Sequence, residues 1–223
     1  MAFDYKKEYK EFYLPKNKPS IVTISPMNFI AVRGSGDPNL EGGAYKKAIS
    51  ILYGIAYTLK MSKKGGRQIE GYFDYVVPPL EGLWWQRQTS GDDSSSDAAQ
   101  GIDYSRKDAF EWISVIRLPD FVTEEDFAWA VEEASRKKND NYSAAAFFSY
   151  EEGLCVQCMH IGSYDDEPAT IVLMHRYMEE QGFELDLSDT RHHHEIYLSD
   201  ARKVAPDRLK TVIRHPIRRR GAL

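Results

Sequence analysis

The chain has 223 residues, of which 42% are hydrophobic and 28% are charged, so it has enough apolar material for one large core or two small ones. Its net charge of −5 argues against a protein that wraps nucleic acid, and we expect no nucleic-acid partner. No apolar run approaches the roughly 18 residues that span a bilayer, and the N-terminus has charges where a signal peptide would be apolar. These features predict a cytoplasmic protein with no membrane partner.

The hydrophobic pattern of the first part of the chain predicts two strands, a helix and two more strands. Apolar residues at helical spacing place the helix between Gly43 and Lys60. A polar, turn-rich insertion is expected from Leu80 to Ser105, with the paired tryptophans Trp84 and Trp85 at its start. We expect this insertion to form a lid over flat ligands, the alternative being that Trp84 only anchors the loop. The strands are expected at 21–24, 28–34, 72–77 and 109–117.

The second part of the chain repeats this order. Thr123 and Asp126 have capping-box-like spacing at the start of a linking helix at about 123–138. A further helix is expected from about Pro168 to the stop signal at Gly182. The strands of this part are expected at 144–150, 154–161, 193–198 and 211–214.

Two pairs of similar motifs occur in the same order in both parts. FIAVRGSGDP at 29–38 resembles QCMHIGSYDDEP at 157–168, and VIRLP at 115–119 resembles VIRHP at 212–216. The repetition predicts an α+β fold of duplicated β-β-α-β-β modules, the first at about 20–119 and the second at about 143–217, within a single unit of residues 1–223. Each module would have one bare sheet face, and we expect the two bare faces to close on a central ligand cleft.

The HIGSYDDEP turn, the helix end MEEQGFEL, the strand HEIYLSD and the segment WISVIRLPDFVTEEDF together resemble the gyrase-inhibitor-like (GyrI-like) small-molecule-binding family. The resemblance implies tandem SHS2-like modules, which often serve as effector domains of transcription regulators. The first strand is expected near residue 20, which leaves no room for a preceding helix-turn-helix domain, so a stand-alone member is expected. Stand-alone relatives are drug-binding proteins or hydrolases that open the cyclopropane of yatakemycin and CC-1065 type DNA alkylators.

Glu195 is the principal candidate for a catalytic residue. Period-two alternation places His193, Glu195 and Tyr197 on one strand face, with His192 and His194 on the other. A carboxylate in an aromatic cleft can act as a general base or as a counter-charge. A salt-bridging surface glutamate is the structural alternative, and the family position of Glu195 favours the functional one. Tyr197 is expected to donate a hydrogen bond to a ligand carbonyl, the alternative being a core tyrosine.

Other candidates for the cleft are aromatic or titratable residues on neighbouring elements. Aligning FDYVVP with HEIYLS places Asp74 opposite Glu195, and His160 is expected to line the cleft or to be a core histidine. Phe147 and Tyr150 are three residues apart, so at most one of them faces the cleft. The predicted ligand-binding residues are Trp85, Trp112, Tyr57, Phe147, Tyr150, His160 and Asp74.

No metal or organic cofactor is expected. Alternation separates the histidines of the HHH run, and Cys155 and Cys158 lie on opposite strand faces, which indicates two core thiols rather than a zinc or redox site. The predicted function is therefore a hydrolase that opens the cyclopropane of bulky planar natural products and so protects the cell. The alternatives are a protein that binds such molecules without changing them, and an inhibitor that binds another protein. A homodimer is possible through an apolar sheet edge, and the sequence does not decide it.

Overall fold

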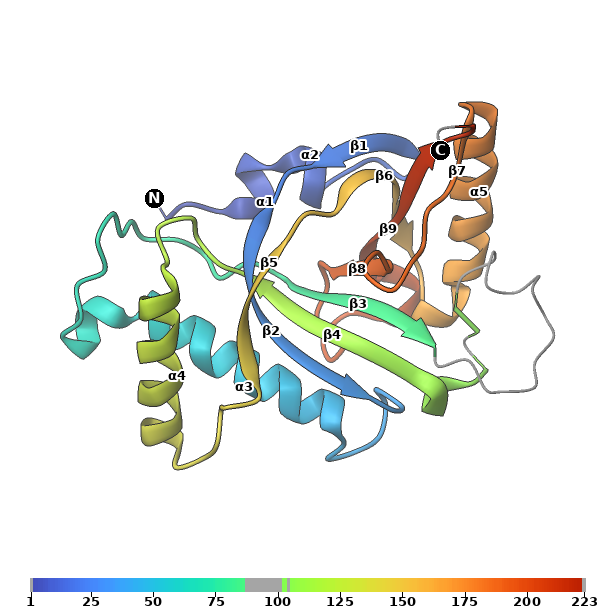
Figure 1. The fold of residues 1–223 in the computed structure, drawn as a ribbon. Helices are drawn as coiled ribbons and strands as arrows, with labels where there is room; N and C mark the ends of the chain where they lie inside the picture. Colours follow the sequence, from blue (N-terminus) through green and yellow to red (C-terminus); the bar gives the residue numbers. More distant parts are fainter. Residues whose placement is uncertain (1, 87–101, 104, 222–223) are drawn as a thin grey trace.

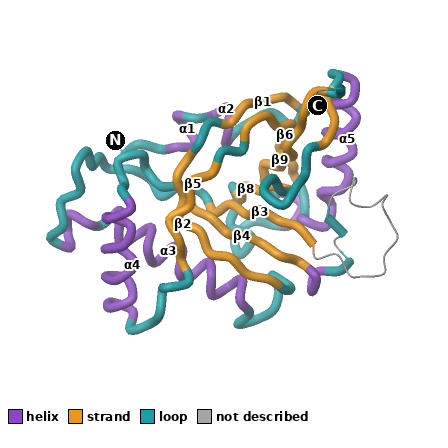
Figure 2. Tube along the Cα trace, in the orientation of Figure 1, coloured by secondary structure: helices purple, strands orange, loops and turns teal. Residues whose placement is uncertain are grey.

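The strands pair into one antiparallel sheet that runs through the whole molecule. In this computed structural model, which describes residues 2–86, 102–103 and 105–221, the strand order is β1-β6-β9-β8-β3-β4-β2-β5, with β7 added beside β9. Figure 2 shows the strands as a strongly curved sheet with the helices around it. The strands are β1 (Ser20–Ile24), β2 (Met27–Ser35), β3 (Leu80–Gln86), β4 (Phe110–Arg117), β5 (Ala145–Tyr150), β6 (Gly153–Ile161), β7 (Phe183–Leu185), β8 (His193–Tyr197) and β9 (Lys210–Arg219).

The α+β fold class predicted from the sequence is confirmed. The strand order also reads the same way from both ends: the strand that opens each half pairs with the other half, since β1 lies beside β6 and β5 lies beside β2. The expected closure of two bare sheet faces on each other is wrong. The halves are instead joined edge to edge by β3 and β8, which makes one sheet of both. The duplication of the module itself stays a prediction.

One predicted strand is not a strand. Residues 72–77 form a loop, and its β-pairing among the described residues is limited to an isolated bridge between Phe3 and Tyr75. The segment from Leu80, expected to open an insertion, is instead the central strand β3. The proposed lid therefore does not begin at the tryptophans, and its middle, residues 90–101, lies outside the described residues.

The three long helices pack on one face of the sheet, and the short helices α1 and α2 lie on the other. The long helix α3 lies against β2 and β4, with α4 beside it, and α5 lies against β6 and β7 (Figure 1). Helix α4 begins at the predicted capping box, in which Thr123 and Asp126 bond each other reciprocally. Among the described residues, no helix is long and apolar enough to cross a bilayer. The helices are α1 (Tyr5–Glu8), α2 (Lys10–Tyr13), α3 (Ala44–Lys60), α4 (Glu124–Lys138) and α5 (Glu167–Glu180), with short 3₁₀ turns η1 (Ser62–Gly65), η2 (Lys107–Ala109), η3 (Tyr164–Asp166) and η4 (Pro206–Arg208).

The sheet face that lies away from α3 contains a buried network of charges. His194 Nδ1 lies 2.9 Å from Glu152 Oε1, and its Nε2 lies 3.0 Å from Glu81 Oε2. Arg214 also bonds Glu152, at 3.1 Å. The N-terminal segment covers this network, because Tyr13 donates to Glu81 and Arg214 donates to the backbone carbonyl of residue 12. Two carboxylates thus meet two cations, so no member of the network is left as an unpaired buried charge.

The same network predicts how stability depends on pH. Although burial by itself opposes the charged imidazole, Glu152 and Glu81 raise the pKa of His194 from 6.5 to about 9. The imidazolium therefore stabilises the fold fully below pH 6.5, and this contribution is lost as the pH rises through about 9. A shift of this size corresponds to about 3 kcal/mol. We expect the free energy of unfolding in urea to fall by this order between pH 6.5 and 9.

The variant His194→Gln should be less stable at neutral pH and should lose most of this alkaline slope. His192→Gln is the matched control, because His192 adjoins the same strand but stacks on Trp85 outside the network. An alkaline slope as steep in His194→Gln as in the wild type would contradict the assignment.

Candidate functional site

Glu195 lies at the middle of the sheet, on the face that α3 and α5 cover. It is 6% exposed. Its neighbour in register on β3 is Gly82, which is in turn opposite Ser114 on β4. Because residues in register share a face, only a glycine lies on this face between Glu195 and β4. The missing side chain at Gly82 leaves room there for larger groups.

Two indoles use the room left by glycines in the sheet. A Cβ added to Gly82 would lie 2.4 Å from Nε1 of Trp84, and one added to Gly34 would lie 2.3 Å from the Trp112 ring. Trp84 and Trp112 are themselves opposite each other on β3 and β4. Both strands thus present an indole on the side of Glu195, beside the carboxylate rather than above it.

Three tyrosines complete the aromatic surroundings of Glu195. The Tyr197 hydroxyl accepts a hydrogen bond of 2.9 Å from Trp84 Nε1. Tyr45, in the first turn of α3, packs 5.2 Å from the Trp84 ring and hydrogen-bonds Tyr197. Tyr164 in η3 meets Tyr197 edge to face at 5.7 Å. All three tyrosines are only partly buried, so they form the side of the site that reaches solvent.

The tyrosine hydroxyls are held in the neutral form. Burial, reinforced by the charge of Glu195, raises the pKa of Tyr197 well above its ordinary value. Burial and Glu195 also raise the pKa of Tyr164 to about 12. Near neutral pH these groups therefore serve as hydrogen-bond donors rather than as bases.

Glu195 is close to a second carboxylate and to an imidazole. His193 Nε2 lies 2.9 Å from Glu195 Oε1. Glu167 is the first residue of α5 and is fully buried. One oxygen of each carboxylate and one nitrogen of His193 all lie within 4.8 Å of one another. The group resembles a metal-ligand set in its spacing, and the His193 nitrogen that faces Glu195 forms a hydrogen bond with it.

The structure brings together some of the predicted site residues. Glu195, Tyr197 and Trp112 lie around the same centre, and Trp112 meets Tyr45 edge to face at 5.1 Å. The predicted alternation also agrees with the hydrogen bonds, since His193 bonds Glu195 while His194 bonds the network on the other face.

Several other predicted residues lie elsewhere. Trp85 is on the opposite face, where it donates to Glu111 and stacks on His192. Tyr150 packs on Phe148 in the cluster that contains Trp85. Phe147 is on the other face of β5, as the offset of three predicts, but packs against Phe127 of α4.

The remaining three candidates are held by local contacts. His160 is buried between the Thr170 hydroxyl and the carbonyl of Ser163, so it shapes the turn before α5. Asp74 does not lie opposite Glu195: its side chain is 69% exposed and pairs with Lys60. The predicted alignment failed because residues 72–77 are a loop and the strand that pairs with β8 begins at Leu80.

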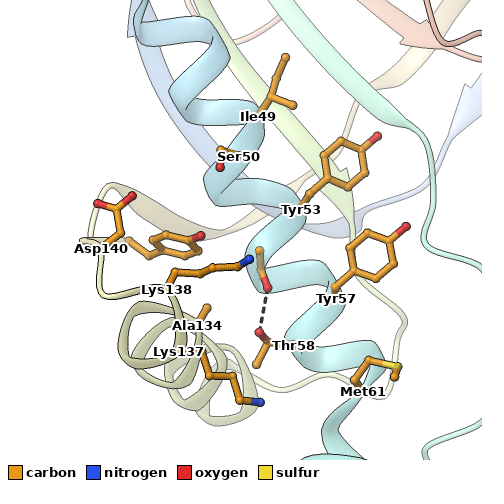
Figure 3. A pocket seen from close by; sticks show the side chains of 12 residues that line it. Ile49, Ser50, Tyr53, Tyr57, Thr58, Met61, Ala134, Lys137, Lys138 and Asp140 are labelled. Atoms are coloured by element: carbon orange, nitrogen blue, oxygen red, sulfur yellow. Dashed lines mark hydrogen bonds between the residues drawn. The ribbon is translucent and has the colours of Figure 1, made fainter. Parts of the chain in front are cut away.

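Tyr57 belongs to a surface groove between α3 and α4. It is 52% exposed and stacks on Tyr53 at 6.2 Å. Figure 3 shows both rings on α3, with Lys137 and Lys138 on the α4 side of a hollow of about 610 Å³. The groove does not include Glu195 or its neighbours. A second hollow of about 420 Å³, along the N-terminal segment and β1, does not include them either.

Three residues of the site were not chosen from the sequence. Glu167 belongs to the GSYDDEP segment that resembles GSGDP in the first part, but the direction of its side chain depends on where α5 begins, which the sequence gives only within a few residues. Tyr45 follows the glycine pair that opens α3, and Tyr164 lies in the turn before α5. Only their position could have indicated a role in the site, because both residues lie where the start of a helix approaches the sheet.

The fold and this site define an α+β protein with a buried carboxylate, Glu195, among aromatic side chains at the centre of its sheet. The sequence profile of the GyrI-like small molecule binding domain matches residues 17–218, and the chain belongs to that family. A comparison with curated protein sequences gives no significant match.

Solved structures agree with this assignment. An uncharacterized conserved protein from Listeria innocua is 46% identical, with a TM-score of 0.87 over 97% of this chain and 100% of that one. A structure described as a hydrolase from Listeria innocua is 45% identical, with a TM-score of 0.84 over the same shares. The EcmrR C-terminal domain, 12% identical with a TM-score of 0.51 over 91% of this chain and 98% of that one, shares the fold.

The packing of Trp84 over Gly82 leads to a testable prediction. Gly82→Ala should lower the free energy of unfolding by about 1–3 kcal/mol, because its Cβ must displace Trp84 and Tyr197 from a packed site. Urea unfolding measures the effect, and ligand affinity should fall with it. Gly65→Ala is the control, since its Cβ would meet only the flexible end of Lys137 at 3.8 Å. Equal stability of the two variants would show that Trp84 does not need this gap.

Proposed function

We propose that the protein is a hydrolase that adds water to bulky, planar, electrophilic small molecules, and in particular opens the cyclopropane of alkylators of the yatakemycin and CC-1065 type. The observation that carries the proposal is the environment of Glu195. The carboxylate is 6% exposed, receives a hydrogen bond from His193, and faces a wall of indole and phenol rings. A carboxylate in this position can accept a proton from an attacking water, and aromatic rings orient a flat ligand by stacking.

The comparisons support the reaction class. The relative described as a hydrolase is 45% identical along 97% of this chain. Its description names no substrate. The choice of a cyclopropane as the substrate group therefore rests on the chemistry of the site and on the family resemblance of the sequence. A strained ring conjugated to a carbonyl is an electrophile that water can open without a cofactor.

In the proposed reaction, Glu195 removes a proton from a water molecule as the water oxygen attacks the cyclopropane CH₂. A carbon–oxygen bond forms and the ring carbon–carbon bond breaks. The electron pair of that bond moves into the conjugated system and places negative charge on the carbonyl oxygen, which stays in the molecule and becomes a phenol when it is protonated. Glu167 is close enough to Glu195 to help hold the water, since a single water bridges carboxylate oxygens at about this separation.

The growing negative charge requires a hydrogen-bond donor. The Tyr197 oxygen accepts the Trp84 N–H, so its own O–H is directed elsewhere, towards Tyr45 or a ligand. The Tyr45–Tyr197 pair therefore provides a phenol donor at the solvent side of the site. Trp112 Nε1 is buried and has no hydrogen-bond partner among the described residues, which makes it a second candidate donor. Donors of this kind stabilise the charge that develops in the transition state.

The second candidate function is binding without chemical change. The family description as a small-molecule-binding domain favours it, and a carboxylate among aromatic rings also suits a cationic guest. If saturating protein returns the ligand unchanged, this alternative replaces the hydrolase.

The decisive measurement is the turnover of a cyclopropane-containing alkylator, followed by mass spectrometry as the gain of one water. We expect Glu195→Gln to reduce turnover by about 100-fold or more, because the amide cannot accept the proton. Ligand affinity should change much less. Asp74→Asn is the matched control, since this carboxylate is exposed and pairs with Lys60 away from the site. Turnover by Glu195→Gln at the wild-type rate would remove Glu195 from the mechanism.

A further inference from the structure

Behind Glu195, three histidines from three elements form a continuous chain of hydrogen bonds. His193 on β8 bonds Glu195 at 2.9 Å through Nε2. Its other nitrogen, Nδ1, lies 2.7 Å from Nε2 of His215 on β9. Nδ1 of His215 lies 2.8 Å from Nε2 of His175 on α5. His193 and His215 are fully buried, whereas His175 is only partly buried, so the chain runs from the carboxylate towards the surface at α5.

The nitrogen atoms that pair along the chain give all its hydrogen bonds the same direction. Each link joins Nε2 of one imidazole to Nδ1 of the next, and the first Nε2 faces a carboxylate. When His193 donates its Nε2–H to Glu195 and is neutral, its Nδ1 must accept from His215. His215 in turn must accept from His175 at its own Nδ1. The carboxylate thus determines the tautomer of all three rings.

His215 and His175 are neutral near pH 7. Burial, together with the neighbouring histidines, lowers the pKa of His215 well below 6.5. Burial likewise lowers the pKa of His175, against an opposing effect of Glu179 on the same helix. Neutral imidazoles can both accept and donate a proton, which is the requirement for passing one along.

We propose that His215 and His175 are positioning residues for Glu195, and that together with His193 they form a proton path between the buried carboxylates and the solvent at α5. The kinetic part of this inference rests on the proposed hydrolase function. The arrangement of the tautomers does not.

The path has two settings that need no ring rotation. In the first, all three rings carry the hydrogen on Nε2 and His193 is neutral. A proton that binds Nδ1 of His175 allows its Nε2–H to pass to Nδ1 of His215, whose Nε2–H passes to Nδ1 of His193. Each step breaks one N–H bond and forms another. His193 ends as an imidazolium, and His215 and His175 then carry their hydrogen on Nδ1. The Nε2–H of His193 keeps its hydrogen bond to Glu195 throughout.

This exchange balances charge at the reacting centre. Glu195 and Glu167 lie within 4.8 Å of His193, and two buried carboxylates are costly without a positive charge nearby. In the second setting of the path, the imidazolium at His193 lies beside them and compensates their charge. When Glu195 takes the proton of the attacking water, one negative charge disappears, and His193 can release its Nδ1 proton outwards through His215 and His175. When Glu195 gives up its proton with the product, the path returns a proton to His193.

The charged and titratable groups beside the path lie on β8, α5 and η3. They are Glu195 and Tyr197 on β8, Glu167 and Glu179 on α5, and Tyr164 in η3. The tyrosines are neutral near pH 7, so the acidic groups nearest His193 are Glu195 and Glu167.

The test uses His175→Gln, which changes only the outer end of the path. The amide N–H₂ can still donate to His215, but it cannot pass a proton on. We expect ligand affinity and folding to be retained and turnover to fall roughly tenfold, less than the about 100-fold of a group that contacts the reacting atoms. Turnover should recover when imidazole is added to the buffer, and the pH–rate profile should lose its dependence on the outer ring. A purely structural role for His175 would give neither recovery nor a changed profile.

His192→Gln is the matched control, because it is the same substitution beside the same strand but stacks on Trp85 outside the path. If His175→Gln keeps wild-type turnover and pH profile, the path does not carry protons and the proposal is overturned.

A second measurement does not depend on activity. In ¹⁵N NMR spectra of the wild type, His193 should be protonated at Nε2 across pH 6–9, and at the upper end of this range His215 and His175 should also carry their hydrogen on Nε2. A His193 ring without a hydrogen on Nε2 would overturn the assignment of the chain. If these tautomers are found but no cyclopropane is turned over by the wild type, the hydrolase proposal fails while the arrangement of the chain stands.

Discussion

The pairing of β3 with β8 is the interaction on which the rest of the structure depends. It joins the two halves into one sheet, places Gly82 beside Glu195, and places Trp84 beside His193. Without this pairing each half would end in an open strand edge, and Glu195 would lie at that edge in contact with water. The carboxylate is buried because it lies on a central strand between β3 and β9.

The two faces of this central region serve different purposes although they share the same strands. On one face, Glu81, His194, Glu152 and Arg214 satisfy one another completely and are closed over by the N-terminal segment. On the other face, Glu195 is satisfied by a single imidazole and stands beside a second carboxylate and three partly buried tyrosines. Adjacent residues of β8 thus contribute to a buried charge network on one side and to the proposed site on the other. The charge network behind the strand supports the position of the proposed site.

The aromatic side chains show how burial and position separate similar residues. Trp84 and Trp85 are neighbours in sequence, but alternation directs the first to Tyr197 and the second to Glu111 on the opposite face. Both belong to the segment expected as a lid. The polar residues that follow them favoured an insertion. The segment LEGLWWQ contains a glycine and no β-branched residue, so its local strand propensity is weak. It forms a strand because neighbouring side chains fill the space beside Gly82. The indole of Trp84 fills that gap itself, and this contact cannot be foreseen from local propensity.

The sequence by itself determined the fold class, the three long helices and the faces of β8, because periodicity of 3.6 or 2 residues is a local property that needs no knowledge of partners. It therefore placed Glu195 and Tyr197 on one face and separated His193 from His194, while the choice of Glu195 as the candidate came from the family resemblance. Tertiary structure decided which strands pair, and so replaced Asp74 by Gly82 opposite Glu195. It also decided that Glu167 and the histidine chain meet there, since His175, His193 and His215 come from elements whose packing is a long-range outcome of the whole sheet.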